Sequence, residues 1–226
     1  MAKQQKRAVL FANGDFPGAK RFIKQIMEDD LLIAVDGGLS HMTRFGLCPD
    51  LIIGDLDSAN MDDVSFFESQ GVEIRKFPRD KNETDLELAI ETVLEMNLST
   101  IWVIAALGNR LDQTLASIFL LTRSDLTNVD IRLIDGEQEV FIIRQSALII
   151  GEPGQRISLL PLGGPVFGIH TEGLKYPLMN ETLFPDQTRG ISNLMTGSTA
   201  FVDIQHGSLI CIHEMLEPSE RSCHHD

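Results

Sequence analysis

The first half of the chain alternates short apolar runs with longer segments of mixed polarity, and this alternation restricts the fold more than any other feature. Each run has the length of a strand and each intervening segment the length of a helix; the runs are 8–12, 31–35, 51–53, 73–77, 101–106 and 131–134. Strands separated by helices form mostly parallel sheets that helices cover on both faces. The sequence therefore predicts an N-terminal α/β domain with a Rossmann-like sheet.

Two of the expected helices carry start signals. Asn60 precedes a segment with apolar residues at helical spacing, which ends at Gly71. Thr84 and Glu87 have the spacing of a capping box at the start of another such segment. We therefore expect helices to begin at these two caps.

The pattern changes near residue 139, where closely spaced strands replace the alternation of strands and helices. The expected strands include 140–143, 157–160 and 200–204. Short strands with Gly- and Pro-rich turns between them are typical of antiparallel sandwiches and barrels. We therefore expect a smaller C-terminal antiparallel β domain, with the domains at residues 1–137 and 138–226.

Composition narrows the classes of partner. The 226 residues carry a formal net charge of −14, which argues against a nucleic-acid partner, because that binding relies on clustered Lys and Arg. The longest apolar runs are far shorter than the roughly 20 residues that span a bilayer. The N-terminal residues MAKQQKR are basic but lack the apolar stretch of a secretory signal. We expect a cytoplasmic protein without membrane contact.

Polar side chains follow several of the predicted strands, at the point where each strand ends. These strand-end segments are Asn13-Gly14-Asp15, Asp36-Gly37-Gly38, Gly54-Asp55-Leu56-Asp57-Ser58 and Gly108-Asn109-Arg110-Leu111-Asp112. In an open α/β sheet, ligands bind beyond the carboxyl ends of the strands. The sequence therefore predicts a binding site at this edge of the sheet.

Asp55 and Asp57 alternate at the end of the third predicted strand. If the backbone bends there, both carboxylates can approach one hard cation, and Mg²⁺ usually takes one or two carboxylates together with substrate phosphates. An isolated D-x-D is more often a turn with solvated acids. The pair predicts a metal site only in combination with other features.

Charged residues also stand at the starts of two predicted helices. Lys81 precedes the helix that Thr84 caps, and Asp85 lies in its first turn. Arg110 and Asp112 repeat this arrangement after the fifth strand. An acid in a first turn is explained by the helix dipole, but a cation beside helix-terminal amides makes a phosphate site. The chain has no P-loop motif and no G-x-G-x-x-G after a strand, so a nucleotide would be bound in another way.

Taken together, several segments resemble thiamin pyrophosphokinases. The matching segments are 34–58, 77–90, 107–118 and, in the β domain, 190–197. The resemblance implies an N-terminal catalytic domain that binds ATP and Mg²⁺, and a C-terminal domain for thiamin binding and dimerisation. It also implies a homodimer that holds thiamin in the cleft between its subunits.

The resemblance also implies residue roles. Acidic positions around magnesium and the ATP phosphates match Asp55, Asp57, Asp85 and Asp112, and basic positions match Lys81 and Arg110. Further candidates at the nucleotide are Asp36, Gly37, Gly38, Thr84 and Gln113; the last stands where many bacterial relatives have His. The metal ligands implied are Asp55, Asp57 and Asp85, and the thiamin contacts are Ser192, Asn193 and Asp85.

Two features outside these motifs receive no role. Some family members stack thiamin on a Trp in the last strands, but Trp102 is the only one here and its apolar surroundings predict a core position. The tail Cys223-His224-His225 is typical of a frayed terminus.

The leading hypothesis is transfer of the pyrophosphoryl group of ATP to the hydroxyl of thiamin, which gives thiamin diphosphate and AMP. Asp57, Asp85, Asp112 and Arg110 are the expected catalytic residues, and either Asp85 or Asp112 would accept the hydroxyl proton. One alternative is a phosphatase of the haloacid dehalogenase type, whose D-x-D usually follows the first strand, not the third. Another is a module that senses nucleotides without turnover.

Overall fold

A computed structural model describes residues 7–108 and 110–215. The tail Cys223-His224-His225 and Asn109 therefore lie outside the described residues. The chain divides into two compact units, residues 1–136 and 137–226, and the predicted division lies one residue further along.

The first unit contains a parallel sheet. Its strands are β1 (Arg7–Phe11), β2 (Asp30–Val35), β3 (Leu51–Gly54), β4 (Glu73–Lys76), β5 (Thr100–Ile104) and β6 (Asp130–Ile134). They lie in the order β6-β5-β1-β2-β3-β4, and each neighbouring pair is parallel. The predicted α/β sheet is confirmed.

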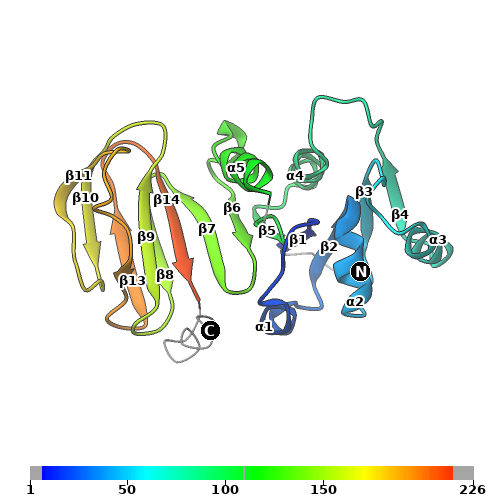
Figure 1. The fold of residues 1–226 in the computed structure, drawn as a ribbon, viewed down its shortest axis with the longest axis horizontal. Coiled ribbons are helices and arrows are strands. Elements are labelled where there is room, and N and C mark those ends of the chain that lie inside the picture. The colour runs from blue at the N-terminus through cyan, green and yellow to red at the C-terminus, as the bar shows by residue number, and fades with distance from the viewer. Residues whose placement is uncertain (1–6, 109, 216–226) are drawn as a thin grey trace. The chain divides into compact units, whose positions relative to one another are not determined.

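Helices cover both faces of this sheet, as the near-continuous apolar character of its strands requires. They are α1 (Ala19–Phe22), α2 (Leu39–Arg44), α3 (Met61–Ser69), α4 (Asp85–Glu95) and α5 (Leu111–Leu120), with short 3₁₀ turns at Ile23–Gln25, Asp36–Gly38 and Ser124–Leu126. Helices α4 and α5 lie on one face, and α1 and α2 lie on the other (Figure 1). Among the described helices, none combines the length and apolar character needed to cross a membrane.

Both predicted helix caps are confirmed. The side chain of Asn60 accepts a hydrogen bond of 2.9 Å from the backbone N–H of Asp62 at the start of α3. The hydroxyl of Thr84 accepts one of 3.2 Å from the N–H of Glu87 at the start of α4. The second cap fixes where α4 begins, and so places Asp85 in its first turn.

A buried ion pair joins the amino ends of β1 and β2. Arg7 on β1 donates from Nε to Asp30 on β2 at 2.9 Å, and both residues are buried. The guanidinium also lies 3.6 Å from the ring centroid of Trp102, which packs against Phe22. Trp102 thus has a structural role at the edge opposite to the predicted site, but it is only partly buried, so its expected core position is not confirmed.

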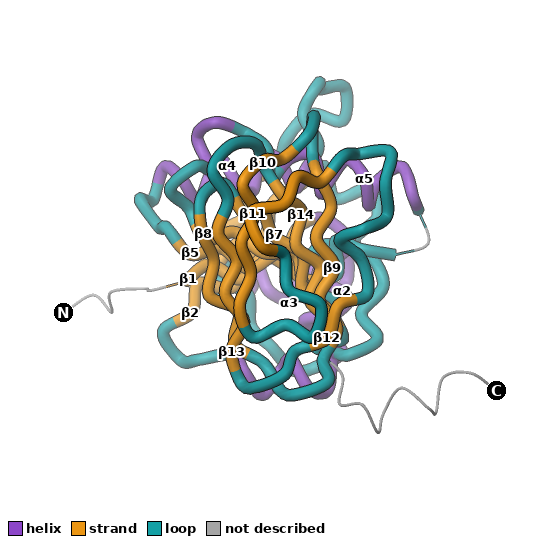
Figure 2. Tube along the Cα trace, turned by 90° about the vertical axis from the view of Figure 1, so that its left-hand side faces the viewer, coloured by secondary structure: helices purple, strands orange, loops and turns teal. Residues whose placement is uncertain are grey.

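The second unit is built from antiparallel strands, which are labelled in Figure 2. Its strands are β7 (Gln138–Ile143), β8 (Ser146–Ile150), β9 (Arg156–Pro161), β10 (Val166–Glu172), β11 (Met179–Leu183), β12 (Asn193–Leu194), β13 (Thr199–Asp203) and β14 (Leu209–Glu214). They pair in the orders β12-β9-β14-β7 and β11-β10-β13-β8. Leu159 of the first group and Val202 of the second share one hydrophobic core. The predicted antiparallel domain is confirmed, and its form is a sandwich.

Candidate active site

A cavity of about 440 Å³ lies at the carboxyl edge of the parallel sheet. The ends of β1, β2 and β5 and the starts of α4 and α5 form its wall. Its lining includes the predicted residues Asp36, Thr84, Asp85, Arg110 and Gln113, together with Asn13, Asp15, Ser58, Thr114 and Ser117. This volume is within the usual range for small-molecule sites.

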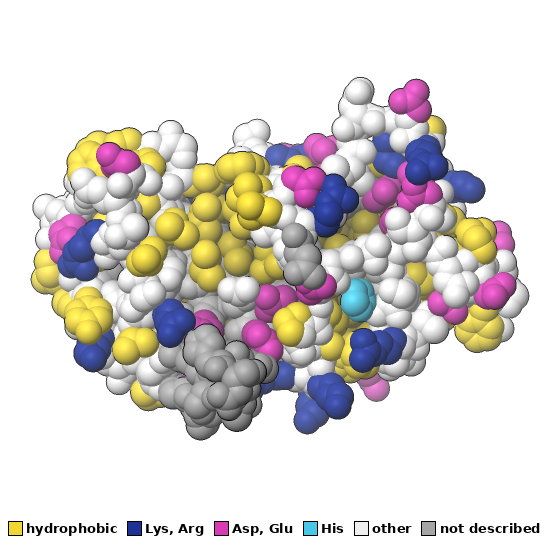
Figure 3. Space-filling model, viewed as in Figure 1, with side chains coloured by type: hydrophobic (Ala, Val, Ile, Leu, Met, Phe, Trp, Pro, Cys, Tyr) yellow, Lys and Arg dark blue, Asp and Glu magenta, His cyan; other side chains and the backbone are white. Residues whose placement is uncertain are grey.

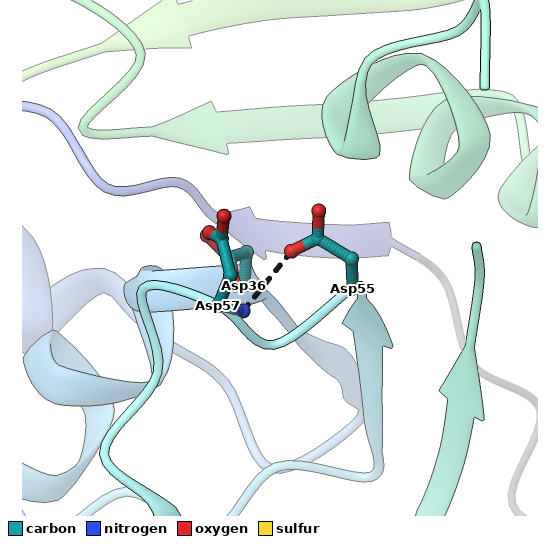
Figure 4. Close-up of side chains that lie close together, drawn as sticks. All are labelled: Asp36, Asp55 and Asp57. Carbon is teal, nitrogen blue, oxygen red and sulfur yellow. Dashed lines mark hydrogen bonds between the residues drawn. The ribbon is translucent and has the colours of Figure 1, made fainter. Parts of the chain in front are cut away.

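Three carboxylates meet at this edge. Each of Asp36, Asp55 and Asp57 offers an oxygen, and these oxygens all lie within 4.8 Å of one another. Figure 4 shows the three side chains projecting to the same side of the loop that follows β3. The backbone N–H of Asp57 donates to Asp55 at 3.0 Å, which holds this loop in a tight turn. Asp36, which the sequence placed at the nucleotide, therefore joins the predicted pair.

The backbone around these acids adopts a conformation that costs energy. Leu56, between the two aspartates, has a φ of 65°, and Asp36 has a φ of 49°. Ala105, at the end of β5, has a φ of 56°. Residues other than glycine rarely adopt positive φ, and such strain gathers at functional sites. The bend at Leu56 brings two alternating carboxylates together, as the sequence hypothesis required.

Gly37 and Gly38 are both buried and do not line the cavity. A Cβ atom at Gly38 would lie 1.8 Å from the carbonyl oxygen of Phe11, and one at Gly37 would lie 2.4 Å from Nδ2 of Asn13. Both glycines therefore allow the end of β1 to approach the turn after β2. Their contact with a nucleotide stays a prediction.

Lys81 and Asp85 form an ion pair across the start of α4. The ammonium lies 2.8 Å from Asp85 Oδ1, and the two side chains are only 11% and 21% exposed. Asp85 reaches the cavity lining but is not among the three clustered acids. Its role as a metal ligand stays a prediction.

Arg110 and Asp112 form an exposed bidentate ion pair. Arg110 directly precedes α5, and Asp112 lies in its first turn. Arg110 donates from Nε at 3.1 Å and from Nη2 at 2.7 Å. The hydrogen bond from Arg110 lowers the pKa of Asp112 to about 2. Asp112 is therefore ionised at neutral pH and is a weak proton acceptor.

Arg79 is a residue of this edge that the sequence analysis did not single out. Its Nη2 lies 2.7 Å from Oδ2 of Asp57, whose Oδ1 accepts a hydrogen bond of 3.0 Å from the hydroxyl of Ser58. The available signal was its position two residues before Lys81 in the loop between β4 and α4. Figure 3 shows acidic and basic side chains gathered over this loop.

In the second unit, Ser192 lines a cavity of about 350 Å³. The other residues of its wall are Glu137, Gln138, Arg156, Ser158, Ile212 and Glu214. Ser192 has a φ of 57°, and its N–H donates to the hydroxyl of Ser158 at 3.0 Å. This predicted thiamin contact is exposed and is held in a strained turn.

The neighbouring Asn193 is buried, and its amide is engaged with the backbone. Oδ1 accepts from the N–H of Tyr176 at 3.0 Å and from that of Leu194 at 2.9 Å. Nδ2 donates to the carbonyl of Tyr176 at 2.7 Å. Asn193 thus fastens the loop at Tyr176 beside Ser192, and its contact with thiamin stays a prediction.

Both units of the chain match known proteins. Residues 22–133 match the sequence model described as thiamin pyrophosphokinase, catalytic domain, and residues 143–210 match its vitamin B1 binding domain. The thiamine pyrophosphokinase of Bacillus subtilis is 30% identical over 187 residues, which are 82% of this chain and 87% of that protein. The chain belongs to the thiamin pyrophosphokinase family.

Solved structures of thiamin pyrophosphokinases share the fold. That from Bacillus subtilis superposes with a TM-score of 0.84 at 28% identity and covers 93% of this chain and 99% of its own. That from Candida albicans gives a TM-score of 0.79 at 21% identity, with 94% and 90% covered, and here the likeness concerns the fold alone. The resemblance predicted from the sequence motifs is confirmed, and it favours pyrophosphoryl transfer over the phosphatase and nucleotide-sensing alternatives.

Proposed function

We propose that the cavity at the carboxyl edge binds ATP and that its residues carry out the family's reaction. Thiamin pyrophosphokinases transfer the pyrophosphoryl group of ATP to thiamin, and this chain has that activity by family membership. The observation that carries the placement of the site is the cluster of Asp36, Asp55 and Asp57 at this edge of the sheet, in which Asp36 also lines the cavity. Strained turns and clustered like charges are retained where a ligand compensates for them.

The donor set of this cluster fits magnesium. Carboxylate oxygens are the hard ligands that Mg²⁺ prefers, and few protein ligands leave room for phosphate oxygens. We assign Asp36, Asp55 and Asp57 as the residues that hold the ion. When bound, Mg²⁺ would neutralise charge on the phosphates of ATP.

Lys81 and Arg110 provide the positive charge that the chain itself brings to the phosphates. Each precedes the first residue of a helix, and backbone N–H groups at the start of a helix favour an anion. Their charges favour the state in which negative charge grows on the phosphate oxygens. Positioning and charge therefore account for most of the catalysis that we assign to the chain.

The reaction needs an acceptor for one proton. The thiamin hydroxyl oxygen forms a bond to the β-phosphorus, and the bond from that phosphorus to the α-phosphate oxygen breaks, so AMP leaves. We assign the proton to Asp85, because it lines the cavity, whereas the low pKa of Asp112 makes that carboxylate a weak base.

The remaining proposal is a homodimer with shared active sites. Ser192 and Asn193, the predicted thiamin contacts, lie in the second unit, and the phosphate site lies in the first. Leu111, Leu115 and Phe119 are exposed at four-residue intervals on α5, and Figure 3 shows hydrophobic side chains gathered over this helix. A second copy that covered this stripe would bring its own residues close to Arg110.

Product analysis tests the proposed function. The protein is incubated with ATP, Mg²⁺ and thiamin, and AMP, ADP and free phosphate are separated. AMP should appear one-for-one with thiamin diphosphate. ADP with thiamin monophosphate would indicate attack at the γ-phosphorus, free phosphate with ADP would indicate hydrolysis, and no turnover would indicate a binding module; each result contradicts the proposal.

A further inference from the structure

Arg79 occupies one oxygen of the carboxylate cluster. Its guanidinium lies 2.7 Å from Asp57 Oδ2, and the other oxygen of Asp57 accepts from Ser58. The Arg79 side chain is 80% exposed, and among the described residues Asp57 is its ion-pair partner. Breaking a single exposed ion pair of this kind costs little free energy.

The charges around Asp57 make this contact exchangeable. Three carboxylates within 4.8 Å repel one another, and one adjacent cation relieves that repulsion. A divalent ion at the cluster supplies more charge than one guanidinium. Two cations on one carboxylate repel each other, which favours release of the guanidinium when a metal binds to Asp57.

The loop that carries Arg79 also leads to residues of the cavity. Lys81, two residues further on, is the residue that we assign to the ATP phosphates, and Thr84 and Asp85 at the end of the same loop line the cavity. A guanidinium binds phosphate oxygens through two parallel hydrogen bonds, which makes it suited to such a partner.

We propose that Arg79 is an exchangeable counter-ion of the active site, which holds Asp57 until the divalent cation binds and then transfers to the triphosphate of ATP. The inference rests on the proposed function, because it uses the metal and nucleotide placement given above. The proposal gives Arg79 two opposite effects. It competes with the free metal ion for Asp57, and it strengthens the binding of ATP that carries the metal.

The first measurement is the binding of Mn²⁺ in the absence of nucleotide. The electron paramagnetic resonance signal of free Mn²⁺ monitors this binding. Arg79→Gln should lower the dissociation constant for Mn²⁺ roughly two- to fivefold, as expected for loss of a competing exposed ion pair. Arg75→Gln is the matched control, because Arg75 pairs with Glu73 on the preceding strand and lies outside the cluster. This control should bind Mn²⁺ as the wild type does.

The second measurement is calorimetric binding of Mg²⁺ with an ATP analogue that has a methylene group between the α- and β-phosphates. Arg79→Gln should weaken this binding by about tenfold, because a charged hydrogen-bond donor is lost. Arg79→Lys should recover part of the affinity. A purely structural arginine would not strengthen one ligand and weaken the other.

Both changes are required. Unchanged or weaker Mn²⁺ binding in Arg79→Gln, or unchanged affinity for the analogue, overturns the proposal while leaving the proposed function in place. Mn²⁺ binding that persists in Asp57→Asn removes the metal assignment, and with it both the placement of the site and the role of Arg79.

Discussion

The ammonium of Lys81 lies 2.8 Å from the carboxylate of Asp85, which is the first residue of α4 and lines the cavity. The sequence assigns these residues to different partners, the phosphates and the metal, and the structure pairs them with each other. Because both side chains are largely buried, the pair holds the ammonium in place beside the first turn of the helix. This arrangement fixes a positive charge at the site before any phosphate is bound.

Lys81→Met should weaken the use of ATP and also lower stability. The Michaelis constant for ATP should rise by at least about tenfold, because a charged donor to phosphate is lost. The free energy of unfolding should fall by about 1–3 kcal/mol, because a hydrogen bond between charged groups is lost in a part-buried pair. Steady-state kinetics and chemical denaturation measure the two effects. Lys76→Met on the neighbouring strand is the control, and equal losses of ATP affinity in both variants would contradict the assignment.

Arg110→Gln should change the titration of Asp112. The hydrogen bond from Arg110 lowers the pKa of this carboxyl to about 2, so its removal should raise the pKa toward the ordinary value of 3.8. The pair stabilises the folded state in full at pH values above the ordinary pKa of the carboxyl. This stabilisation is lost as the pH falls through the lowered pKa. Carboxyl carbon NMR on acidification should show Asp112 protonating earlier in the variant. Coincident titration curves would contradict this account of the pair.

Asn193→Ala and Ser192→Ala should differ in stability. Loss of the buried Asn193 amide removes its hydrogen bonds with the N–H and the C=O of Tyr176, at a cost of about 1–3 kcal/mol. The side chain of Ser192 is exposed, so its truncation should leave the free energy of unfolding nearly unchanged and raise the Michaelis constant for thiamin. Thermal unfolding and thiamin kinetics compare the two. Equal stability of both variants would contradict the structural role of Asn193.

Several features of the fold and site were predictable because they depend on local sequence. The caps at Asn60 and Thr84 use side chains within three residues of the groups that they satisfy. The edge of the sheet was predictable because parallel strands end together, and residues after each apolar run must meet there. Asp55 and Asp57 belong to this class, since both follow one strand.

Other features depend on contacts that sequence spacing does not show. Asp36 joins the acidic cluster because β2 and β3 are neighbours, with Val35 opposite Ile53. The positive φ of Leu56 is imposed by the tight turn around it, because leucine has no preference for that conformation. Asn193 is engaged by a loop that lies 17 residues earlier in the chain. For Asp36 and Asn193, a distant segment determines what the residue does.

The shared-site dimer predicts recovery of activity on mixing two inactive variants. Asp57→Asn removes the phosphate chemistry and Ser192→Tyr blocks the thiamin contact. After dissociation and reassociation in equal amounts, half of the dimers should be mixed, and each should hold one intact site. Activity should therefore recover to about a quarter of the wild type. If subunits exchange and the mixture stays inactive, each site belongs to a single chain.

The central claim is that Asp57 holds the metal that serves ATP at this edge of the sheet, and a change of metal preference tests it most directly. Asp57→Cys replaces a hard oxygen ligand with a soft thiolate, which favours Cd²⁺ over Mg²⁺. Turnover with Mg²⁺ should fall by at least about 100-fold, as for loss of a group that stabilises developing charge. In Asp57→Cys, turnover with Cd²⁺ should be at least about tenfold faster than turnover with Mg²⁺. Cd²⁺ should not stimulate the wild type or the adjacent Ser58→Cys control. Near wild-type turnover with Mg²⁺, or no selective gain with Cd²⁺, would contradict the assignment of Asp57 to the metal.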